Sequence, residues 1–387
     1  MSQPDLSFLA TSDEKWALGI EVKAVSRKRV DDFRCLGGQL VLRAGPDFWL
    51  MTGESTDYLG SVHCLNNNWP DSFSSTLYCH PVYPDVVAGF PLAGDAWRVR
   101  LEPDIFRLVV QGDRVYVGTR RAYDGPGCLF AFDKEGTLAW RYDYMDVSKE
   151  RGVQGMPYHL RVSERWGVVA TAFMEYLYLF DAASGRLLWR IDIDHYRKEL
   201  EFAGDLCAHP AVMQVLKEFL EQFLGVSLVN WIRFHPRKPL VFVKARSGDS
   251  VLVFDLAGRL VWLRRFVEHG EVYSPFDPHL AVFDQTGRFI LLAGGEGIWK
   301  LLDEYGREMA AGRIPVPAAA VSIAPDASWL SAFRKEPNVL YLFSRTSQVL
   351  LEKPLASLRR IAALGDKLVI LERQSQRLYI VEIVLEH

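Results

Sequence analysis

Three stretches of the sequence repeat one pattern, which limits the possible folds more than any other feature of the chain. Each has an apolar segment, an acidic residue, a turn with Gly and a second segment with Trp. The stretches are 129–140, 178–189 and 252–262, and their acidic residues are Asp133, Asp181 and Asp255. Two β-strands joined by a tight turn produce such a pattern. We therefore predict a β-hairpin at each stretch, with weaker copies at 301–307, 340–344 and 378–382.

A second pair of strands precedes each hairpin, and its position is regular. The second strand of this pair begins 15 residues before the acidic or polar position of the hairpin at five places. These are Trp166 to Asp181, Leu240 to Asp255, Arg288 to Asp303, Trp329 to Ser344, and Lys367 to Glu382. A spacing held five times is stronger evidence for a repeat than any single strand assignment. The predicted unit is therefore four antiparallel strands.

The distances between hairpins predict how the units are combined. Asp133 and Asp181 are 48 residues apart, as are Asp255 and Asp303, whereas 74 residues separate Asp181 from Asp255. The longer distance fits one unit plus an insertion, and the mean length of about 44 residues is usual for propeller repeats. We predict an all-β chain that forms a single β-propeller domain over 1–387, with about seven four-stranded blades. A loop insertion is expected at 52–97 in the first blade, and a helical insertion at 194–227.

The last repeat has no fourth strand of its own before His387. The apolar segment 16–24 near the N-terminus can supply that strand. Pairing of both ends of the chain in one blade would remove free strand edges, which otherwise invite aggregation. We therefore predict that the N-terminal segment pairs with the last repeat.

From residue 104 onward the chain resembles two related propeller families. The segments Asp113–Thr119 and Phe180–Trp189 resemble the repeat of quinoprotein-like propellers, and Val321–Asp326 resembles the WD-repeat pattern. The resemblance implies a fold and not an activity, because many propellers share these hairpins. A quinoprotein dehydrogenase would imply a bound quinone, a calcium ion and a secreted enzyme. The chain has neither a secretory leader nor an adjacent cysteine pair, so we expect no cofactor.

Composition narrows the classes of partner. The chain has 45 Lys and Arg against 48 Asp and Glu, a formal net charge of -3. Nucleic-acid-binding domains are usually strongly basic, so no nucleic-acid partner is expected. No apolar run approaches the ~18 residues that a membrane span requires. Five scattered cysteines favour a reducing compartment, and we expect a cytoplasmic protein.

The first insertion contains two pairs of potential zinc ligands, His63 with Cys64 and Cys79 with His80. Two Cys and two His suit tetrahedral zinc, but neither pair has the gap of two to four residues found in zinc ribbons and fingers. Ordinary packing of a long loop is the favoured interpretation, and no metal is expected.

The second insertion contains the clearest helical pattern of the sequence. Over 210–224 the apolar residues recur at helical spacing and include Val215, Leu216, Phe219, Leu220 and Phe223. This stripe is expected either to dock on the side of the propeller or to bind a partner or a second copy.

The loop after 114–119 is four residues longer than its counterparts and begins with a basic pair. Arg120, Arg121 and Tyr123 are candidates to meet an acidic partner, since loops on one propeller face commonly form a binding surface. A solvated turn is the alternative interpretation of these residues.

No nucleophile elbow, phosphate-binding loop, zinc-protease helix or kinase signature is present. The sequence therefore favours a non-enzymatic scaffold that presents loops and the helical insertion to a protein partner. The alternative is a metal-dependent hydrolase or lyase that uses carboxylates of the central channel.

Overall fold

The fold is all-β in the part of the chain that the computed structural model describes. The described residues are 9–12, 14–17, 20–36, 39–44, 47–52, 55–61, 76–79, 86–91, 97–101, 104–120, 127–144, 157–173, 176–193, 229–245, 250–266, 276, 278–315, 318–334 and 338–384. Within these ranges the chain forms strands β1 to β33 and one short 3-10 turn, η1 (Gly295–Gly297). The predicted helix over 210–224, with the whole insertion 194–227, lies outside the described residues.

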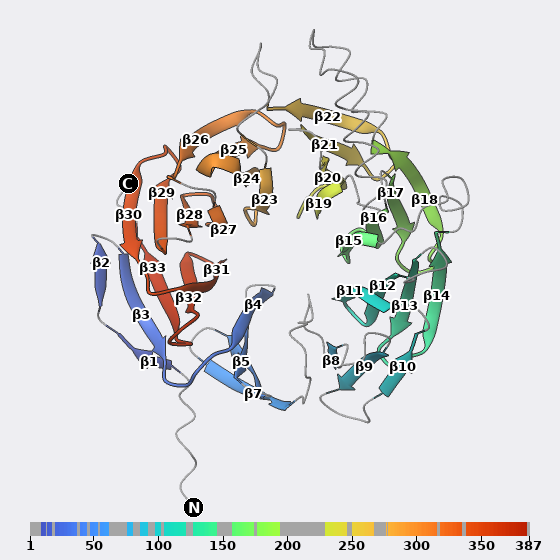
Figure 1. Ribbon diagram of the computed structural model, residues 1–387, viewed down its shortest axis with the longest axis horizontal. Coiled ribbons are helices and arrows are strands. Elements are labelled where there is room, and N and C mark those ends of the chain that lie inside the picture. The colour runs from blue at the N-terminus through green and yellow to red at the C-terminus, as the bar shows by residue number, and fades with distance from the viewer. Residues whose placement is uncertain are drawn as a thin grey trace, which may run out of the picture. The chain divides into compact units, whose positions relative to one another are not determined.

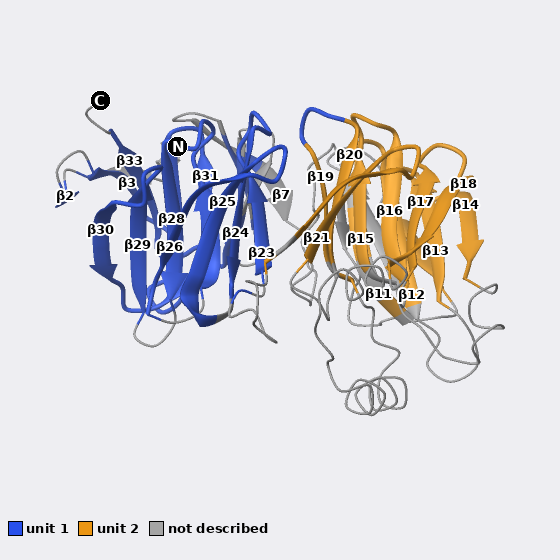
Figure 2. Cartoon of the chain, turned by 90° about the horizontal axis from the view of Figure 1, so that it is seen from above, with its two compact units in different colours: residues 1–63, 236–238, 275–387 blue, residues 64–235, 239–274 orange. Residues whose placement is uncertain are grey.

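The chain divides into two compact units, coloured separately in Figure 2. Unit 1 comprises residues 1–63, 236–238 and 275–387, and unit 2 comprises 64–235 and 239–274.

Unit 2 holds four antiparallel sheets, whose strands are labelled in Figure 1. Sheet C has three strands, β8 (Thr76–Cys79), β9 (Val86–Pro91) and β10 (Trp97–Arg100). Sheet D has β11 (Asp104–Gln111), β12 (Arg114–Arg120), β13 (Cys128–Asp133) and β14 (Leu138–Asp143). Sheet E has β15 (Pro157–Ser163), β16 (Val168–Phe173), β17 (Tyr176–Asp181) and β18 (Leu187–Asp192). Sheet F has β19 (Val229–Phe234), β20 (Leu240–Ala245), β21 (Ser250–Asp255) and β22 (Leu260–Arg265).

Unit 1 holds the other four sheets. Sheet B has β4 (Asp32–Leu36), β5 (Gln39–Ala44), β6 (Asp47–Thr52) and β7 (Ser55–Ser61). Sheet G has β23 (Pro278–Phe283), β24 (Phe289–Gly294), β25 (Ile298–Asp303) and β26 (Glu308–Arg313). Sheet H has β27 (Ala318–Ile323), β28 (Trp329–Arg334), β29 (Val339–Ser344) and β30 (Val349–Pro354). Sheet A joins β31 (Leu358–Leu364), β32 (Lys367–Glu372) and β33 (Leu378–Ile383) to β1 (Leu9–Thr11), β2 (Lys15–Ala17) and β3 (Ile20–Ser26).

The two ends of the chain meet in sheet A. Strand β3 pairs antiparallel with β33, with Ile20 opposite Ile383 and Val22 opposite Val381. The predicted pairing of the N-terminal segment with the last repeat is therefore confirmed. Strands β1 and β2 both pair with β3, so that sheet A extends beyond four strands.

The spacing of 15 residues corresponds to the register between the second and third strands of each sheet. Leu240 lies opposite Asp255, Trp329 opposite Ser344, and Lys367 opposite Glu382. In sheet E the residue opposite Asp181 is Val168, two positions after Trp166. In sheet G the residue opposite Asp303 is Phe289, one position after Arg288. The repeat found in the sequence is therefore a true structural repeat.

The described residues form eight sheets, one more than the number of blades that the spacing predicted. The difference arises at 52–97, which was expected to be a loop insertion. There, β7 is the fourth strand of sheet B, and β8, β9 and β10 form sheet C. In sheet C the segment between β9 and β10 has Gly94 before Asp95, the reverse of the order in the repeat, so the repeat pattern did not reveal these strands although Trp97 follows.

The hydrophobic core is divided into layers between neighbouring sheets. Between sheets D and E, for example, Leu129 and Tyr144 pack with Leu160, Val169 and Tyr178, all of them buried. Similar layers join C to D, E to F, G to H, H to A, and A to B. Because layers cover both faces of sheets D, E, H and A, the inner strands of these four sheets are apolar over most of their length.

Tryptophans of the last strands of sheets C, D and E join neighbouring sheets of unit 2. Trp140 of sheet D donates its indole N–H to the carbonyl of Ala182, 3.0 Å away, in the third hairpin turn of sheet E. Its ring lies on Gly185, where an added Cβ would come within 2.4 Å of the indole. Gly at this turn is therefore required both by its φ of +71° and by the close approach of the ring. The same contact recurs between Trp97 and the turn at Lys134 and Gly136, and between Trp189 and the turn at Leu256 and Gly258.

Candidate functional site

The two ends of each sheet differ in how the strands are connected. In sheets D to H, tight turns join the first strand to the second and the third to the fourth at one end, which we call the turn end. The connection between the second and third strands and the connection to the next sheet leave from the opposite end, the loop end. The connections 144–156, 193–228 and 266–277, the longest of sheets D to H, all start at a loop end.

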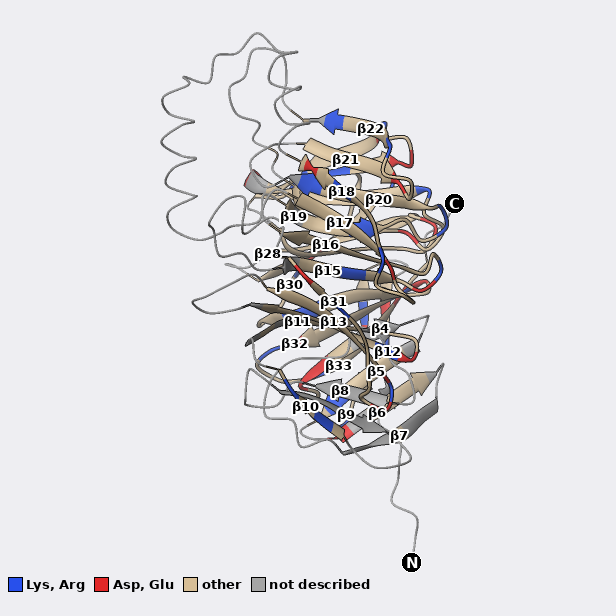
Figure 3. Ribbon diagram, turned by 90° about the vertical axis from the view of Figure 1, so that its right-hand side faces the viewer, with Lys and Arg blue, Asp and Glu red and all other residues tan. Residues whose placement is uncertain are grey.

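Ordered carboxylates hold the turn ends. Asp255 Oδ1 accepts hydrogen bonds from the backbone N–H groups of Ala257 and Arg259, both at 2.9 Å, and its Oδ2 accepts one from Arg259 Nε at 2.8 Å. Burial acts to raise the pKa of Asp255, but these hydrogen bonds outweigh it and hold the pKa below its usual range. Asp303 makes the same contacts with Tyr305 and Arg307. Figure 3 shows charged residues in turns that connect the strands. The hydrogen bonds of Asp255 and Asp303 to the backbone of their own turns show that the repeated Asp is a turn-forming residue.

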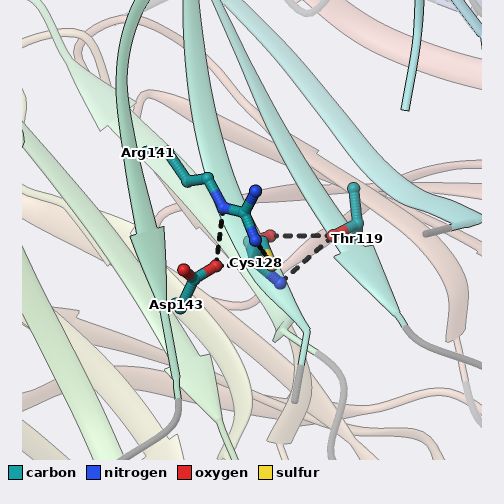
Figure 4. Close-up of polar contacts among 4 residues, drawn as sticks. All are labelled: Thr119, Cys128, Arg141 and Asp143. Carbon is teal, nitrogen blue, oxygen red and sulfur yellow. Dashed lines mark hydrogen bonds and ion pairs between the residues drawn. The ribbon is translucent and has the colours of Figure 1, made fainter. Parts of the chain in front are cut away.

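A polar cluster stands at the loop end of sheet D (Figure 4). The thiol of Cys128 donates to Asp143 Oδ1 at 2.8 Å, and Arg141 Nε donates to the same oxygen at 2.7 Å. Arg141 Nη2 also lies 3.6 Å from Cys128 Sγ. Thr119 Oγ1 accepts from the backbone N–H of Cys128 at 3.1 Å and donates to its carbonyl at 3.2 Å. Three strands, β12, β13 and β14, are thereby tied together where they end or begin.

The role of this cluster is to stabilise the structure. Burial, together with the hydrogen bond to Asp143 and its charge, raises the pKa of Cys128 to about 11. The group is therefore a protonated thiol at neutral pH and a poor nucleophile, since the thiolate is the reactive form. What the cluster does is hold the strand ends from which the connections 121–127 and 144–156 depart.

The structure places few of the predicted site residues. Arg120 is the last residue of β12, and its backbone lies opposite Asp104 at the loop end of sheet D, beside the cluster. Arg121 and Tyr123 lie outside the described residues, as do Val215, Leu216, Phe219, Leu220 and Phe223. The role of Arg120 in partner binding stays a prediction. Sequence reasoning missed Cys128 and Asp143, which lie opposite each other just outside the first predicted hairpin, 129–140.

The predicted alternative of a zinc site is largely outside the described residues. Cys79 is the last residue of β8, whereas His63, Cys64 and His80 are not described. Among the described side chains, no group of three or more His, Cys, Asp or Glu is placed to hold a metal ion. The same part of the chain contains no helix with the length and apolar character needed to cross a membrane.

Comparison with known proteins identifies the fold. No protein-family model matches the sequence, and no curated protein matches it. Among solved structures, BamB from Moraxella catarrhalis is similar over 94% of this chain and 99% of its own, with a TM-score of 0.59 and 11% identity. Sqt1 from Saccharomyces cerevisiae is similar over 92% and 97%, with a TM-score of 0.57 and 11% identity. The computationally designed protein Ika8 is similar over 92% and 97%, with a TM-score of 0.59 and 13% identity.

All three are β-propellers, one of the quinoprotein-like and one of the WD-repeat type, so the resemblance found in the sequence is confirmed at the level of fold. The β-propeller commonly serves as a protein-interaction scaffold. At these identities the similarity extends to the fold alone.

Proposed function

We propose that this chain is a non-enzymatic interaction scaffold that binds a protein partner at the loop ends of its sheets. The observation that carries the proposal is the unequal construction of the two sheet ends. The turn ends are closed by short hydrogen-bonded turns and by docked tryptophans. The longest connections of sheets D to H leave from the loop ends. Loops carried on a rigid framework are where propellers and other β-folds place binding residues.

The loop end of sheet D is the favoured contact surface. The cluster of Thr119, Cys128, Arg141 and Asp143 holds its three strand ends in one arrangement, so that the residues between them need less ordering on binding. Arg120 lies at this end, and Arg is enriched among the residues that dominate protein interfaces. An acidic partner surface is therefore expected opposite Arg120 and Arg121.

The predicted helix over 210–224 supplies a second contact in this proposal. The connection that contains it runs from the loop end of sheet E to the loop end of sheet F. Both proposed contacts thus belong to connections that leave from the same end of the sheets of unit 2. A cytoplasmic location belongs to the same proposal, and the alternative of a metal-dependent hydrolase or lyase stays a prediction.

The test is affinity capture of partners from the native host with the full-length protein as bait. Arg120→Glu and Phe219→Asp are compared with Lys134→Glu, which makes the same charge change as the first variant at the turn end of sheet D. We expect a specific partner to be retained by Lys134→Glu and lost, by about tenfold or more, from Arg120→Glu. Circular dichroism and melting curves establish that each bait is folded.

Equal capture by the wild type, Arg120→Glu and Phe219→Asp would contradict the use of the loop ends. Loss of partner capture by Lys134→Glu, with capture by the other two variants unchanged, would show that the contact surface lies at the turn end. Unfolding of Phe219→Asp would show that the helix docks on its own propeller, and Arg120→Glu would then carry the test.

A further inference from the structure

Two arginines from neighbouring sheets of unit 1 lie over one aromatic ring. The guanidinium carbon of Arg345 is 4.3 Å from the centre of the Phe289 ring, and that of Arg288 is 5.7 Å from the same centre. Arg288 follows the first turn of sheet G, and Arg345 lies in the turn between the third and fourth strands of sheet H. Both arginines are exposed, whereas Phe289 is buried. Two positive charges are thus held close together at the turn end.

Neither arginine forms an ion pair with a carboxylate in the part of the chain that the structure describes. Arg288 Nε donates a hydrogen bond to Thr286 Oγ1 at 3.3 Å. The remaining N–H groups of the two guanidinium groups have no acceptor among the described residues. A guanidinium group has five such donors, so most of them are available to a ligand.

Two carboxylates lie in adjoining turns, and each is bound by its own turn. Asp284 Oδ1 accepts from the backbone N–H of Phe289 at 3.0 Å, and Asp326 Oδ1 accepts from that of Ser328 at 2.9 Å. Burial acts to raise the pKa of Asp326, and hydrogen bonds from Ser328 together with the charge of Arg288 lower it. Asp326 thus attracts Arg288 without forming an ion pair with it.

A second ring of sheet G also has two cations near it, and there both cations are paired. Lys238 Nζ and the guanidinium carbon of Arg307 each lie 5.4 Å from the centre of the Tyr305 ring. Lys238 forms an ion pair with Glu304, and Arg307 Nε forms one with Asp303 at 2.7 Å. Cations gathered at a ring are therefore neutralised at one site of this unit and left without a carboxylate at the other.

The turn of sheet H that carries Arg345 lacks the carboxylate found in its counterparts. In sheets D to G the corresponding turn begins with an acidic residue, namely Asp133, Asp181, Asp255 and Asp303. In sheet H this position is Ser344, whose Oγ accepts from the backbone N–H of Gln348 at 3.1 Å. The hydroxyl keeps the hydrogen bond of the turn but brings no negative charge, so Arg345 stays uncompensated.

We propose that Arg288 and Arg345 together bind a phosphate monoester. Contact with an aromatic ring uses the flat face of a guanidinium group, so the N–H donors in its plane remain available to an anion. A monoester carries about −1.5 to −2 charges at neutral pH and three acceptor oxygens, which suits two guanidinium groups, whereas a carboxylate has one charge and two oxygens. The site lies at the turn end, so the inference is independent of the loop-end contact proposed above.

The monoester can belong to a phosphorylated side chain or to a free small molecule, because the recognised group is the same. Phosphorus-31 NMR titration with the full-length protein measures its binding. The probes are methyl phosphate and the peptide acetyl-Gly-phosphoserine-Gly-amide, and methyl sulfate, a monoanion of similar shape, is the competitor. We expect millimolar binding of both phosphates and competition by methyl sulfate that is weaker by about tenfold. Binding should weaken below about pH 6, where the monoester gains a proton.

The protein variants are Arg288→Gln and Arg345→Gln, with Arg307→Gln as the matched control. The control removes the same charge from an exposed arginine of sheet G that is already ion-paired. We expect each of the first two variants to weaken phosphate binding by about fivefold or more, and the control to leave it unchanged. Arg345→Lys keeps the charge without the fork of donors, so its affinity should lie between those of the wild type and Arg345→Gln. Melting curves establish that each variant is folded.

Three results would overturn the proposal. These are an unchanged phosphorus signal with both probes at millimolar concentration, competition by methyl sulfate as strong as by methyl phosphate, and equal weakening of phosphate binding by Arg307→Gln. Tighter binding of the peptide than of methyl phosphate would support the site and assign it to a phosphorylated side chain, and equal binding would support it as a site for a free ester. Arg120→Glu should leave phosphate binding unchanged, so this test and the capture of a partner at the loop ends have separate outcomes.

Discussion

At the scale of single residues, the repeated Asp, Gly and Trp act together in the third hairpin turns of sheets D, E and F. Asp181 accepts hydrogen bonds from the backbone and side chain of Ser184 and so fixes the turn. Gly185 supplies the positive φ and the space, and Trp140 of the neighbouring sheet fills that space. A pattern found as a hairpin signal is therefore also the contact that joins one sheet to the next.

Replacement of Gly185 by Ala tests this contact, with Gly167→Ala as the matched control in the same sheet. Both glycines have positive φ, +71° and +59°, but an added Cβ at Gly167 would meet nothing within 4 Å. We expect Gly167→Ala to cost about 1 kcal/mol of unfolding free energy from backbone strain alone. Gly185→Ala should cost roughly 1–3 kcal/mol more, because Trp140 must move. Urea midpoints measure both, and equal shifts would show that the indole contact contributes nothing.

The turn carboxylates give the fold a dependence on acid pH. Burial acts to raise the pKa of Asp303, but hydrogen bonds from Arg307 and Tyr305 outweigh it and lower the pKa. A lowered pKa in the folded state stabilises the protein above the unfolded value of about 3.9, and this contribution is lost as the pH falls through the folded value. We expect Asp303→Asn to be less stable than the wild type at pH 7, by about 1–2 kcal/mol. The difference should shrink towards pH 3.

Urea midpoints at both pH values check this prediction. Glu135→Gln is the control, because the Glu135 side chain is 61% exposed in a turn of sheet D and its replacement should change the midpoint little at either pH. A deficit of Asp303→Asn that is the same at pH 3 as at pH 7 would contradict a role for the ionised carboxylate.

At the scale of elements, the strands pair as their spacing predicts. The N-terminal strands complete the last sheet and cover part of its hydrophobic layer. Ile20 and Val22 of β3 are buried in the layer shared with sheet H, and β3 covers the edge of β33. Strand β2 contributes less, mainly through Trp16, which lies near Tyr379 and Lys353. The first strands of the chain are thus part of the last sheet.

Deletions that end on either side of β3 separate these contributions. Removal of residues 1–26 exposes β33 and a hydrophobic layer, so we expect the melting temperature to fall by roughly 10 °C or more. Removal of residues 1–17 leaves β3 in place and should lower the melting temperature by only a few degrees. Calorimetry of the two truncated proteins and the full chain measures the difference, and an unchanged melting temperature for the longer deletion would refute the pairing.

At the scale of the whole molecule, the repeat was a sufficient guide to fold class and an incomplete guide to the number of sheets. Regular hairpins predicted the four-stranded sheets D to H and the composite sheet A. Sheet C was missed because the segment between β9 and β10 places Gly before Asp, the reverse of the other turns, and because a stretch rich in Asn and Ser precedes its first strand. Similarity to solved propellers at 11–13% identity shows how much sequence variation this architecture tolerates.

The sequence by itself determined an all-β chain of four-stranded units, the register between the second and third strands to within two positions, and the pairing of its two ends. These features follow from local rules, since turn chemistry and the two-residue period of a strand act over a few neighbouring residues. The tertiary structure alone decided sheet C and the cluster of Cys128 with Arg141 and Asp143. Each of these depends on which strands become neighbours and which side chains that packing covers, and no local pattern in the sequence records the outcome.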